Sequence, residues 1–262
     1  MSDSMLLSFS AIISLIPPTL LAMRQNHQPD VIFWMILIVA VVGPLNCILF
    51  SMAGTWQTNL PNTLWVTVSA TMIVFTIVTI LTDHTWRLAP LITAYLATLG
   101  LIALIWNSIP SKPLDTAINS NNWIGVHIGL SIGTYALVTI AAVAALAAFL
   151  QERALKKKQQ TSITKILPSV ADCEKLEVKL LVLGEIILVI GLSSGMALQY
   201  ANSGAFLAFD HKTILSITAF LVIGGLLVAH YKTGLRGRKA TRIILLAYLL
   251  LTLGYPGVKF IT

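Results

Sequence analysis

The sequence predicts an all-α protein, a polytopic integral membrane bundle of eight transmembrane helices in a single domain of residues 1–262. The first observation is the composition: 56% of the 262 residues are hydrophobic, 10% are charged and the mean hydropathy is +0.85. Soluble domains carry about 25% charged residues, so this composition excludes an ordinary soluble protein. The second observation is that eight apolar stretches are each long enough to cross a bilayer as a helix. The lipid bilayer is therefore the first partner that the sequence implies.

The first four predicted spans are residues 5–23, 31–53, 63–82 and 88–108. Pro17 and Pro18 remove backbone donors and are expected to kink or break the first helix, and Pro44 is expected to bend the second. All six tryptophans of the chain lie near predicted span ends, where an amphipathic ring sits at the level of the headgroups. Spans two to four have no ionisable residue in their interiors, so we interpret residues 1–110 as a four-span scaffold half.

The last four predicted spans are residues 124–150, 179–199, 213–231 and 240–258. The fifth span is rich in alanine, and small residues let helices approach closely in lipid, so we expect it to be central. The sixth span contains Glu185, roughly 9 Å in from the cytoplasmic start of the span. A carboxylate at that depth indicates either a function or a buried structural partner such as Lys179. Gly191 and Gly195 form a GxxxG pattern that is typical of helix–helix contacts.

The segment between the fifth and sixth spans, residues 151–178, is predicted to be a basic loop that faces the cytoplasm. Lys156, Lys157 and Lys158 at its start would suit anionic headgroups or an acidic partner. The alternative is that residues 162–178 form a short interfacial helix interrupted by Pro168.

Lysine and arginine predict the orientation. Of the 17 such residues, 14 fall in the loops after spans one, three, five and seven, and the other side keeps Lys112, Lys212 and Lys259. The positive-inside rule makes the first set cytoplasmic, so both termini should face the outer, periplasmic side. The net charge of +7 is then a signal of orientation and not of nucleic-acid binding. The N-terminal stretch MSDSMLL has no basic region, so we expect no cleaved signal peptide.

Motifs for most catalytic chemistries are missing from the sequence. It contains no GxSxG nucleophile motif, no glycine-rich phosphate loop before a helix and no CxxC pair. Cys47 falls inside a span and Cys173 in a polar loop, so we expect no disulfide between them. Histidine remains as the residue type most able to carry chemistry.

Three histidines lie at the ends of predicted spans. His127, Ser131 and Tyr135 follow an i, i+4, i+8 spacing and therefore share one helix face. Imidazole is a common axial ligand of haem iron, and hydroxyls can support such a ligand, although a polar stripe can also serve only helix packing. His211 and His230 flank the seventh span and lie roughly 28 Å apart on one helix, so they cannot share a metal ion.

The second half of the chain, residues 123–262, resembles the cytochrome c assembly protein family, the group of CcsA, ResC and HemX, and most of all its short HemX-like and YpjD-like inner-membrane members. Three stretches carry the resemblance: HIGLSIGTYA at 127–136, SGAFLAFDHK at 203–212 and HYKTGLRGR at 230–238. The first is similar to the family's outer histidine helix, the second to its tryptophan-rich haem platform, and the third to its span-end histidine and following turn.

The resemblance implies a multi-pass protein of the bacterial inner membrane that handles haem, with His127 as an outer ligand and His230 as the intramembrane one. Phe206 and Phe209 would offer an aromatic surface to the porphyrin, beside Asp210. His211 stands where the family has proline and is the alternative candidate for the second outer histidine, which the sequence lacks beyond Val258. The platform tryptophans are also replaced, by Ser203, Leu207 and Phe209. We therefore expect a role in cytochrome c assembly or haem metabolism, and not a complete haem-attachment enzyme.

Two other interpretations stay open. The chain could be a membrane scaffold or regulator without haem that engages a partner, such as another assembly or haem-synthesis protein, through its basic loop. It could also be a secondary transporter that uses Glu185 as a proton-coupled carboxylate, but the two halves show no inverted repeat, which is the usual sign of such proteins.

Overall fold

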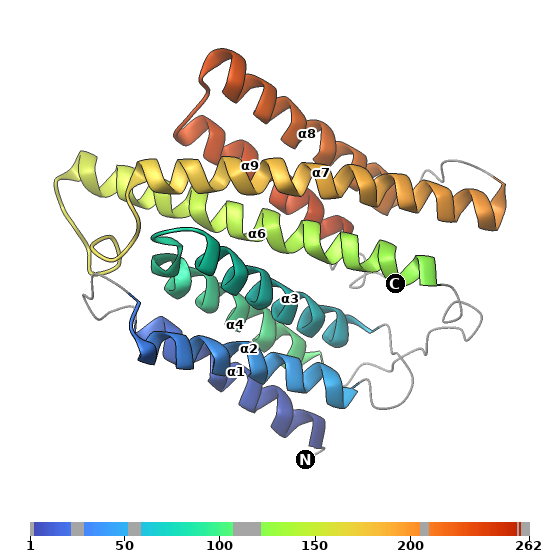
Figure 1. The fold of residues 1–262 in the computed structure, drawn as a ribbon, viewed down its shortest axis with the longest axis horizontal. Coiled ribbons are helices and arrows are strands. Elements are labelled where there is room, and N and C mark those ends of the chain that lie inside the picture. The colour runs from blue at the N-terminus through green and yellow to red at the C-terminus, as the bar shows by residue number, and fades with distance from the viewer. Residues whose placement is uncertain are drawn as a thin grey trace. The chain divides into compact units, whose positions relative to one another are not determined.

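The computed structural model describes residues 3–21, 29–51, 59–106, 122–204, 210–255 and 257, and every regular element in these ranges is helical. The elements, shown in Figure 1, are α1 (Asp3–Leu21), α2 (Val31–Ser51), α3 (Leu60–Leu81), the 3₁₀ helix η1 (Thr85–Leu88), α4 (Ala89–Ile105), α6 (Asn122–Lys157), α7 (Val170–Ser203), α8 (His211–Thr233) and α9 (Arg238–Gly254). The all-helical prediction is confirmed for this part of the chain.

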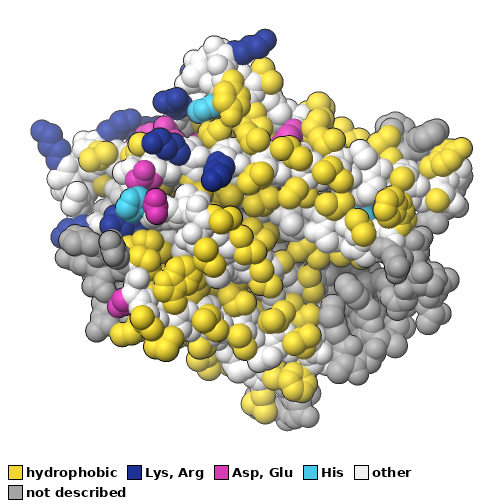
Figure 2. Space-filling model, viewed as in Figure 1, with side chains coloured by type: hydrophobic (Ala, Val, Ile, Leu, Met, Phe, Trp, Pro, Cys, Tyr) yellow, Lys and Arg dark blue, Asp and Glu magenta, His cyan; other side chains and the backbone are white. Residues whose placement is uncertain are grey.

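Six of these elements are long and apolar enough to cross a membrane: α2, α3, η1 with α4, α6, α7 and α8. The first helix contains a shorter apolar stretch, Met5–Leu20. The last helix, α9, has 17 residues, or roughly 25 Å, and begins with basic side chains, so it lies at the lower limit of the roughly 17–25 residues of a membrane-spanning helix. Apolar side chains are spread widely over the described part of the face seen in Figure 2, as expected of a multi-pass membrane protein.

The chain divides into two compact units, which we describe separately. Unit 1 comprises residues 1–113 and 146–173, and unit 2 comprises residues 114–145 and 174–262. The long helix α6 contributes to both units, and α7 lies in unit 2 from Glu174 onward.

Unit 1 is organised around contacts of α1 with α2 and α4, and of α3 with α2 and α4. Between α1 and α4, the hydroxyl oxygens of Thr19 and Thr93 lie 3.0 Å apart. The indole of Trp65 is buried against Gly100, where an added Cβ would come within 3.1 Å of the ring. This tryptophan therefore packs in the core of unit 1.

The predicted break at Pro17 and Pro18 does not occur. The first helix, α1, continues through both residues to Leu21, and α2 continues through Pro44 to Ser51, so the kink in α1 and the bend in α2 stay predictions. Lipid offers no competing partners for backbone groups, so a helix is favoured over an open chain even where proline removes a donor.

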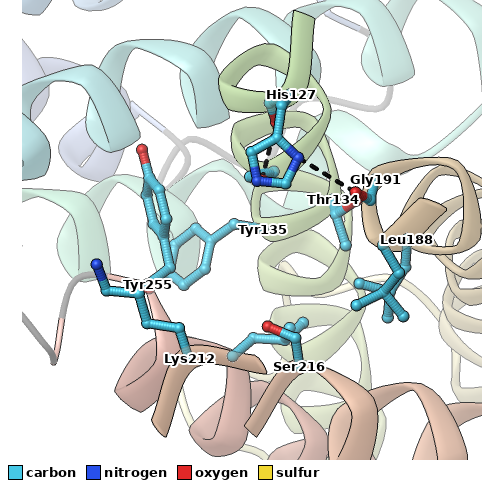
Figure 3. A pocket seen from close by; sticks show the side chains of 12 residues that line it. His127, Thr134, Tyr135, Leu188, Gly191, Lys212, Ser216 and Tyr255 are labelled. Carbon is cyan, nitrogen blue, oxygen red and sulfur yellow. Dashed lines mark hydrogen bonds between the residues drawn. The ribbon is translucent and has the colours of Figure 1, made fainter. Parts of the chain in front are cut away.

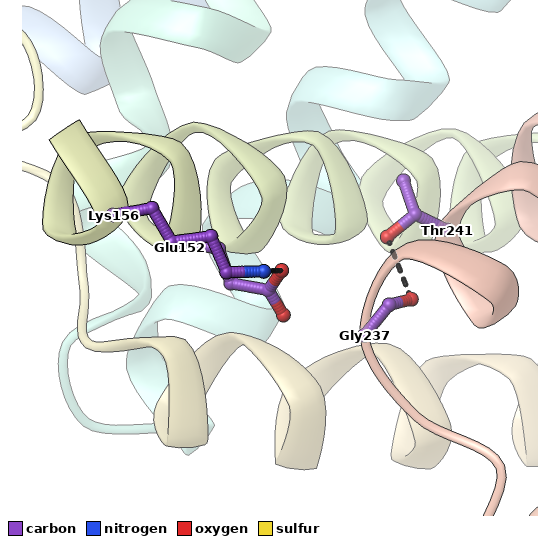
Figure 4. A network of polar contacts seen from close by, with 4 residues as sticks. All are labelled: Glu152, Lys156, Gly237 and Thr241. Atoms are coloured by element: carbon purple, nitrogen blue, oxygen red, sulfur yellow. Dashed lines mark hydrogen bonds and ion pairs between the residues drawn. The ribbon is translucent and has the colours of Figure 1, made fainter.

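The predicted cytoplasmic loop 151–178 is much shorter in the structure. Helix α6, the fifth predicted span, runs on to Lys157. Near its end Lys156 and Glu152 form an i,i+4 ion pair of 4.0 Å, shown in Figure 4. Helix α7, the sixth predicted span, already begins at Val170, because the hydroxyl of Ser169 accepts a hydrogen bond from the backbone N–H of Asp172 at 3.2 Å. Pro168 therefore precedes a helix and does not interrupt one, and Cys173 is buried on its first turn.

The glycines of α7 bring it close to α6 in unit 2. An added Cβ would lie 3.3 Å from Val138 at Gly184, 3.7 Å from Leu130 at Gly191, and 2.9 Å from the His127 ring at Gly195. Rising numbers on α7 meet falling numbers on α6, so the two helices run antiparallel. The helix-contact role predicted for Gly191 and Gly195 is confirmed.

A tight turn joins α8 to α9, and its glycines explain the GLRG sequence. Gly234 adopts a left-handed conformation with φ of 67°, and its N–H donates to the carbonyl of His230 at 3.0 Å, which ends α8. Gly237 has φ of 65° and precedes α9, where the hydroxyl of Thr241 donates back to the Gly237 carbonyl at 3.3 Å (Figure 4). Both backbone conformations are disfavoured for residues with a Cβ.

Candidate functional site

A cavity of about 150 Å³ lies in unit 2, at the end where α6 and α8 begin and α7 and α9 end. All four helices contribute to it, as Figure 3 shows. Its lining combines one imidazole, hydroxyl groups, one ammonium group and aliphatic side chains, from His127, Ser131, Thr134, Tyr135, Leu188, Gly191, Leu192, Lys212, Ser216, Leu251, Gly254 and Tyr255. Three of the residues predicted from the sequence, His127, Ser131 and Tyr135, are thus brought together on one wall.

The imidazole of His127 is held by α7. Its Nδ1 lies 2.9 Å from the hydroxyl oxygen of Ser194 and 3.2 Å from the carbonyl oxygen of Gly191. The Ser194 hydroxyl itself donates to the same carbonyl at 2.8 Å, so its hydrogen is already committed. Gly195 leaves room for the ring, because a Cβ there would lie 2.9 Å from Cε1.

These contacts decide which ring nitrogen of His127 carries the hydrogen. A carbonyl can only accept, and the Ser194 oxygen is left as an acceptor, so Nδ1–H is the donor to both. The other nitrogen, Nε2, then bears a lone pair on a residue that lines the cavity. Histidine ligands of metals are usually oriented in this way, by an N–H donated to a backbone carbonyl or a similar acceptor.

A cluster of tyrosines forms the adjacent wall. The hydroxyl oxygen of Tyr135 lies 3.0 Å from that of Tyr248 and 3.3 Å from that of Thr252, both on α9. The ring of Tyr135 also lies 6.0 Å from the ring of Tyr255, centre to centre. The rings of Tyr135 and Tyr255 form an aromatic surface on the cavity, and the hydroxyl of Tyr135 is held from behind by α9; such a surface suits contact with a flat apolar ligand.

Ser131 plays a different part from the one expected. Its hydroxyl donates to the carbonyl of His127 at 2.9 Å, on its own helix. The hydrogen is therefore used within α6, and Ser131 can offer only acceptor lone pairs to the cavity.

The start of α8 places one positive charge on the cavity. Lys212 lines it, whereas the neighbouring His211 is exposed and does not. Asp210 caps the helix by accepting the N–H of Thr213 at 2.9 Å. Hydrogen bonding by the side chain of Thr213, then by its backbone N–H, and the nearby charge of Lys212 lower the pKa of the Asp210 carboxyl below its usual range. Asp210 thus acts on the helix and is not part of the lining.

His230 lies near the other end of α8, roughly 27 Å along the helix axis from Lys212. Its Nδ1 lies 3.1 Å from the carbonyl oxygen of Leu235, and its ring meets that of Tyr231 edge to face at 5.4 Å. The structure therefore does not bring His230 to the cavity. Phe206 and Phe209 lie outside the described residues.

The cavity suits a haem by the chemistry of its lining but not by its volume. The lone pair of His127 and the tyrosine surface suit an axial ligand and a flat macrocycle. The volume of about 150 Å³ is below the 300–1,000 Å³ of sites that enclose a drug-sized ligand. The cavity can accordingly admit an edge of a macrocycle, or several waters, but cannot enclose the whole ring. Among the described residues, no three His, Cys, Asp or Glu side chains are grouped to hold a metal ion.

Among the lining residues that were not predicted from the sequence are Tyr255 beside α9 and Lys212 and Ser216 on α8. The residues that contact His127 and Tyr135 from behind the wall were not predicted either: Ser194 on α7, and Tyr248 and Thr252 on α9. The spacing of Tyr248, Thr252 and Tyr255, at i, i+4 and i+7, places them on one helix face and is a signal that could have found them.

Comparison with known proteins supplies a family. Residues 4–262 match the family described as "Cytochrome C assembly protein". The chain belongs to this family. A protein of Azospirillum brasilense named "Uncharacterized 28.8 kDa protein in nifR3-like 5'region" is 45% identical across 100% of this chain and 98% of its own length. The "Inner membrane protein YpjD" of Escherichia coli K12 is 28% identical over 192 residues, which are 72% of this chain and 70% of YpjD.

The family resemblance predicted from the sequence is therefore confirmed, and membership supports a role in cytochrome c biogenesis. The apolar helices and the similarity to an inner membrane protein place the chain in the bacterial inner membrane as a multi-pass protein.

Proposed function

We propose that this protein handles haem in cytochrome c assembly, or regulates that process, with His127 as the ligand of haem iron. The observation that carries the proposal is the anchoring of Nδ1 by Gly191 and Ser194, which leaves Nε2 for the cavity. A bound haem would supply a redox-active iron. The protein's part is to hold the imidazole in one tautomer, to offer the tyrosine surface and to keep one cation, Lys212, near the opening.

The proposal includes a topology of eight spans with both termini on the periplasmic side. In unit 2 the described cations lie mainly at the end opposite the cavity, on the first turns of α7 and around the turn between α8 and α9: Lys175, Lys179, Lys232, Arg236, Arg238, Lys239 and Arg242. By the positive-inside rule that end is cytoplasmic, and the cavity faces the periplasm. His230 then belongs to the cytoplasmic end, where it could hold haem separately before a relay, but it cannot share a haem with His127.

We also propose that the protein is not by itself a haem-attachment enzyme. The cavity presents one histidine, and covalent attachment would need a larger haem platform than a volume of about 150 Å³ provides. Binding haem, or passing it to other assembly proteins, would need a smaller haem platform than covalent attachment does.

Titration of the purified chain with hemin, followed by absorption spectroscopy, tests the proposal. We expect a Soret band that shifts on binding to the wild type and to His211→Ala, and a loss of that shift in His127→Ala. His211→Ala is a matched control, because His211 lies at the same end of unit 2 but does not line the cavity. Wild-type protein without a shift at any hemin concentration, or His127→Ala that binds equally well, would overturn the proposal.

A second candidate function is a scaffold or regulator without haem. The small volume of the cavity favours it, together with the exposed side chains of Lys157, Lys158 and Lys165 in and beside the 158–169 segment. If this is correct, Ala substitution of these lysines disturbs cytochrome c levels in cells, whereas His127→Ala leaves them unchanged.

A further inference from the structure

Glu185 carries a carboxyl group that the proposed function does not use. It lies near the middle of α7, 15 residues after Val170 and 18 before Ser203, or roughly 22 and 27 Å along the helix. Both carboxyl oxygens are buried, and neither has a hydrogen-bond partner within the described residues. A polar group in such a position is costly, so its retention calls for a physical role.

Gly224 of α8 makes the room for this carboxyl. A Cβ at Gly224 would lie 2.9 Å from Oε1 of Glu185. The neighbouring helices bring no charge to it: residues 136–150 of α6 and 213–229 of α8 contain no ionisable side chain, and residues 180–199 of α7 contain only Glu185. On α9, residues 243–254 contain only Tyr248, whose hydroxyl contacts that of Tyr135.

The protonation state follows from these surroundings. An ionised carboxylate without a cation or a hydrogen-bond donor carries an effective penalty of several kcal/mol inside a protein. A protonated carboxyl avoids that penalty, because it is neutral. Glu185 therefore holds a proton for as long as water stays away from it.

The cavity offers a route for that proton. Glu185, Leu188 and Leu192 follow an i, i+3, i+7 spacing on α7, and the two leucines line the cavity. Leu188 lies about 4.5 Å above Glu185 along the helix axis. The cavity wall also contains the hydroxyl of Thr134, which is buried and lacks a partner in the described structure. A cavity of this size with such a group has room for ordered water, which would reach to within one helical turn of the carboxyl.

We propose that Glu185 is a proton-binding site inside the membrane, and that it gains and loses its proton through the His127 cavity, past Leu188. No exchange is expected from the opposite end, where apolar side chains such as the buried Leu181 lie between Glu185 and the charged start of α7. The site works in the protein without haem and does not depend on the proposed ligand role of His127.

Infrared spectroscopy of the full chain in lipid tests the protonation state. The wild type at neutral pH is expected to show the carbonyl band of a protonated carboxylic acid, and Glu185→Gln is expected to lack it. Labelling with a hydrophobic carbodiimide, which adds to protonated carboxyls, gives an independent check by mass spectrometry. Glu185 should take up the reagent, and Glu174, near the water-exposed start of the same helix, should not. A wild-type spectrum without the band, or equal labelling of both residues, would overturn the proposal.

The route is tested by transfer of the same samples to D₂O. Leu188→Phe narrows the path from the cavity and should slow the deuterium shift of the Glu185 band several-fold, whereas Leu181→Phe, below the carboxyl, should leave it unchanged. The reverse pattern would place the route at the other end and refute the one proposed. A hemin titration on Glu185→Gln separates the two ideas, because Glu185 does not line the cavity and loss of the proton site does not require loss of haem binding.

Discussion

The contact between Gly195 and His127 allows a sharp test of how the imidazole is held. In Gly195→Ala the new Cβ would lie 2.9 Å from Cε1 of the ring, whereas carbon atoms pack best at about 3.5–4.0 Å. The ring must therefore withdraw by about 0.6–1.1 Å. Its Nδ1 already lies 3.2 Å from the Gly191 carbonyl, so a withdrawal of this size breaks that hydrogen bond.

The magnitude follows from the value of one hydrogen bond. A net contribution of about 0.5–1.5 kcal/mol corresponds to about a 2- to 13-fold loss of affinity for a ligand that His127 holds. Gly191→Ala is the matched control, because its Cβ would meet Leu130 at 3.7 Å, which is an ordinary contact. Both changes replace a helical glycine on the same face of α7, so any gain in helix propensity is shared.

The assay is hemin titration of both variants, with thermal unfolding measured in parallel. We expect Gly195→Ala to weaken hemin binding by the factor above and Gly191→Ala to bind as the wild type does. Equal affinities for the two variants would refute the idea that the Gly191–Ser194 anchor positions the ligand. A parallel loss of stability in Gly195→Ala alone would show that the clash is relieved by moving α6 and not the ring.

Three further predictions concern individual side chains. Asp210→Ala removes the cap of α8 and should cost about 1 kcal/mol of stability. Because the pKa of Asp210 is lowered in the folded state, this stabilisation is present above the ordinary aspartate pKa and disappears as the pH falls through the lowered pKa. Chemical denaturation at several pH values measures this dependence. Phe75→Ala, in the core of unit 1, should cost about 3–5 kcal/mol in the same assay without changing the hemin affinity of the protein that remains folded. Tyr248→Phe removes one of two hydroxyls near that of Tyr135 and should cost about 1 kcal/mol, whereas Tyr135→Phe, which loses both contacts, should cost more.

The helices could be predicted from the sequence because lipid imposes length and apolarity on each of them separately. The contact face of Gly191 and Gly195 was readable for a similar reason, since close approach in lipid requires small residues. The loop 151–178 was mispredicted because its charged residues suggested exposed chain. The buried side chains of Leu176 and Leu180 and the cap at Ser169 continue the helix through that segment.

The cavity could be predicted only in part. His127, Ser131 and Tyr135 share a helix, so their spacing alone placed them on one face. The partners of His127 lie 64 and 67 residues away, and the tyrosines of α9 more than 110 residues away. Local spacing contains no information about which helices become neighbours, so these residues had to come from the structure.

The polar groups of unit 2 share one physical solution to a common difficulty, the cost of charge in the apolar interior of a membrane protein. His127 is oriented by a backbone carbonyl and a serine hydroxyl, where many metal sites in water use a carboxylate. The tyrosine hydroxyls satisfy one another, and the carboxyl of Glu185 lies where only its neutral form is cheap. Among the described lining residues the formal charge is that of Lys212, which lies on the first turn of α8, where it can reach water. A carboxylate introduced by Ser194→Asp would break this arrangement, because it would add a negative charge that only a protonated His127 could offset. We therefore expect Ser194→Asp to weaken hemin binding more than Ser194→Ala, and the opposite order would show that the site tolerates a charged second partner.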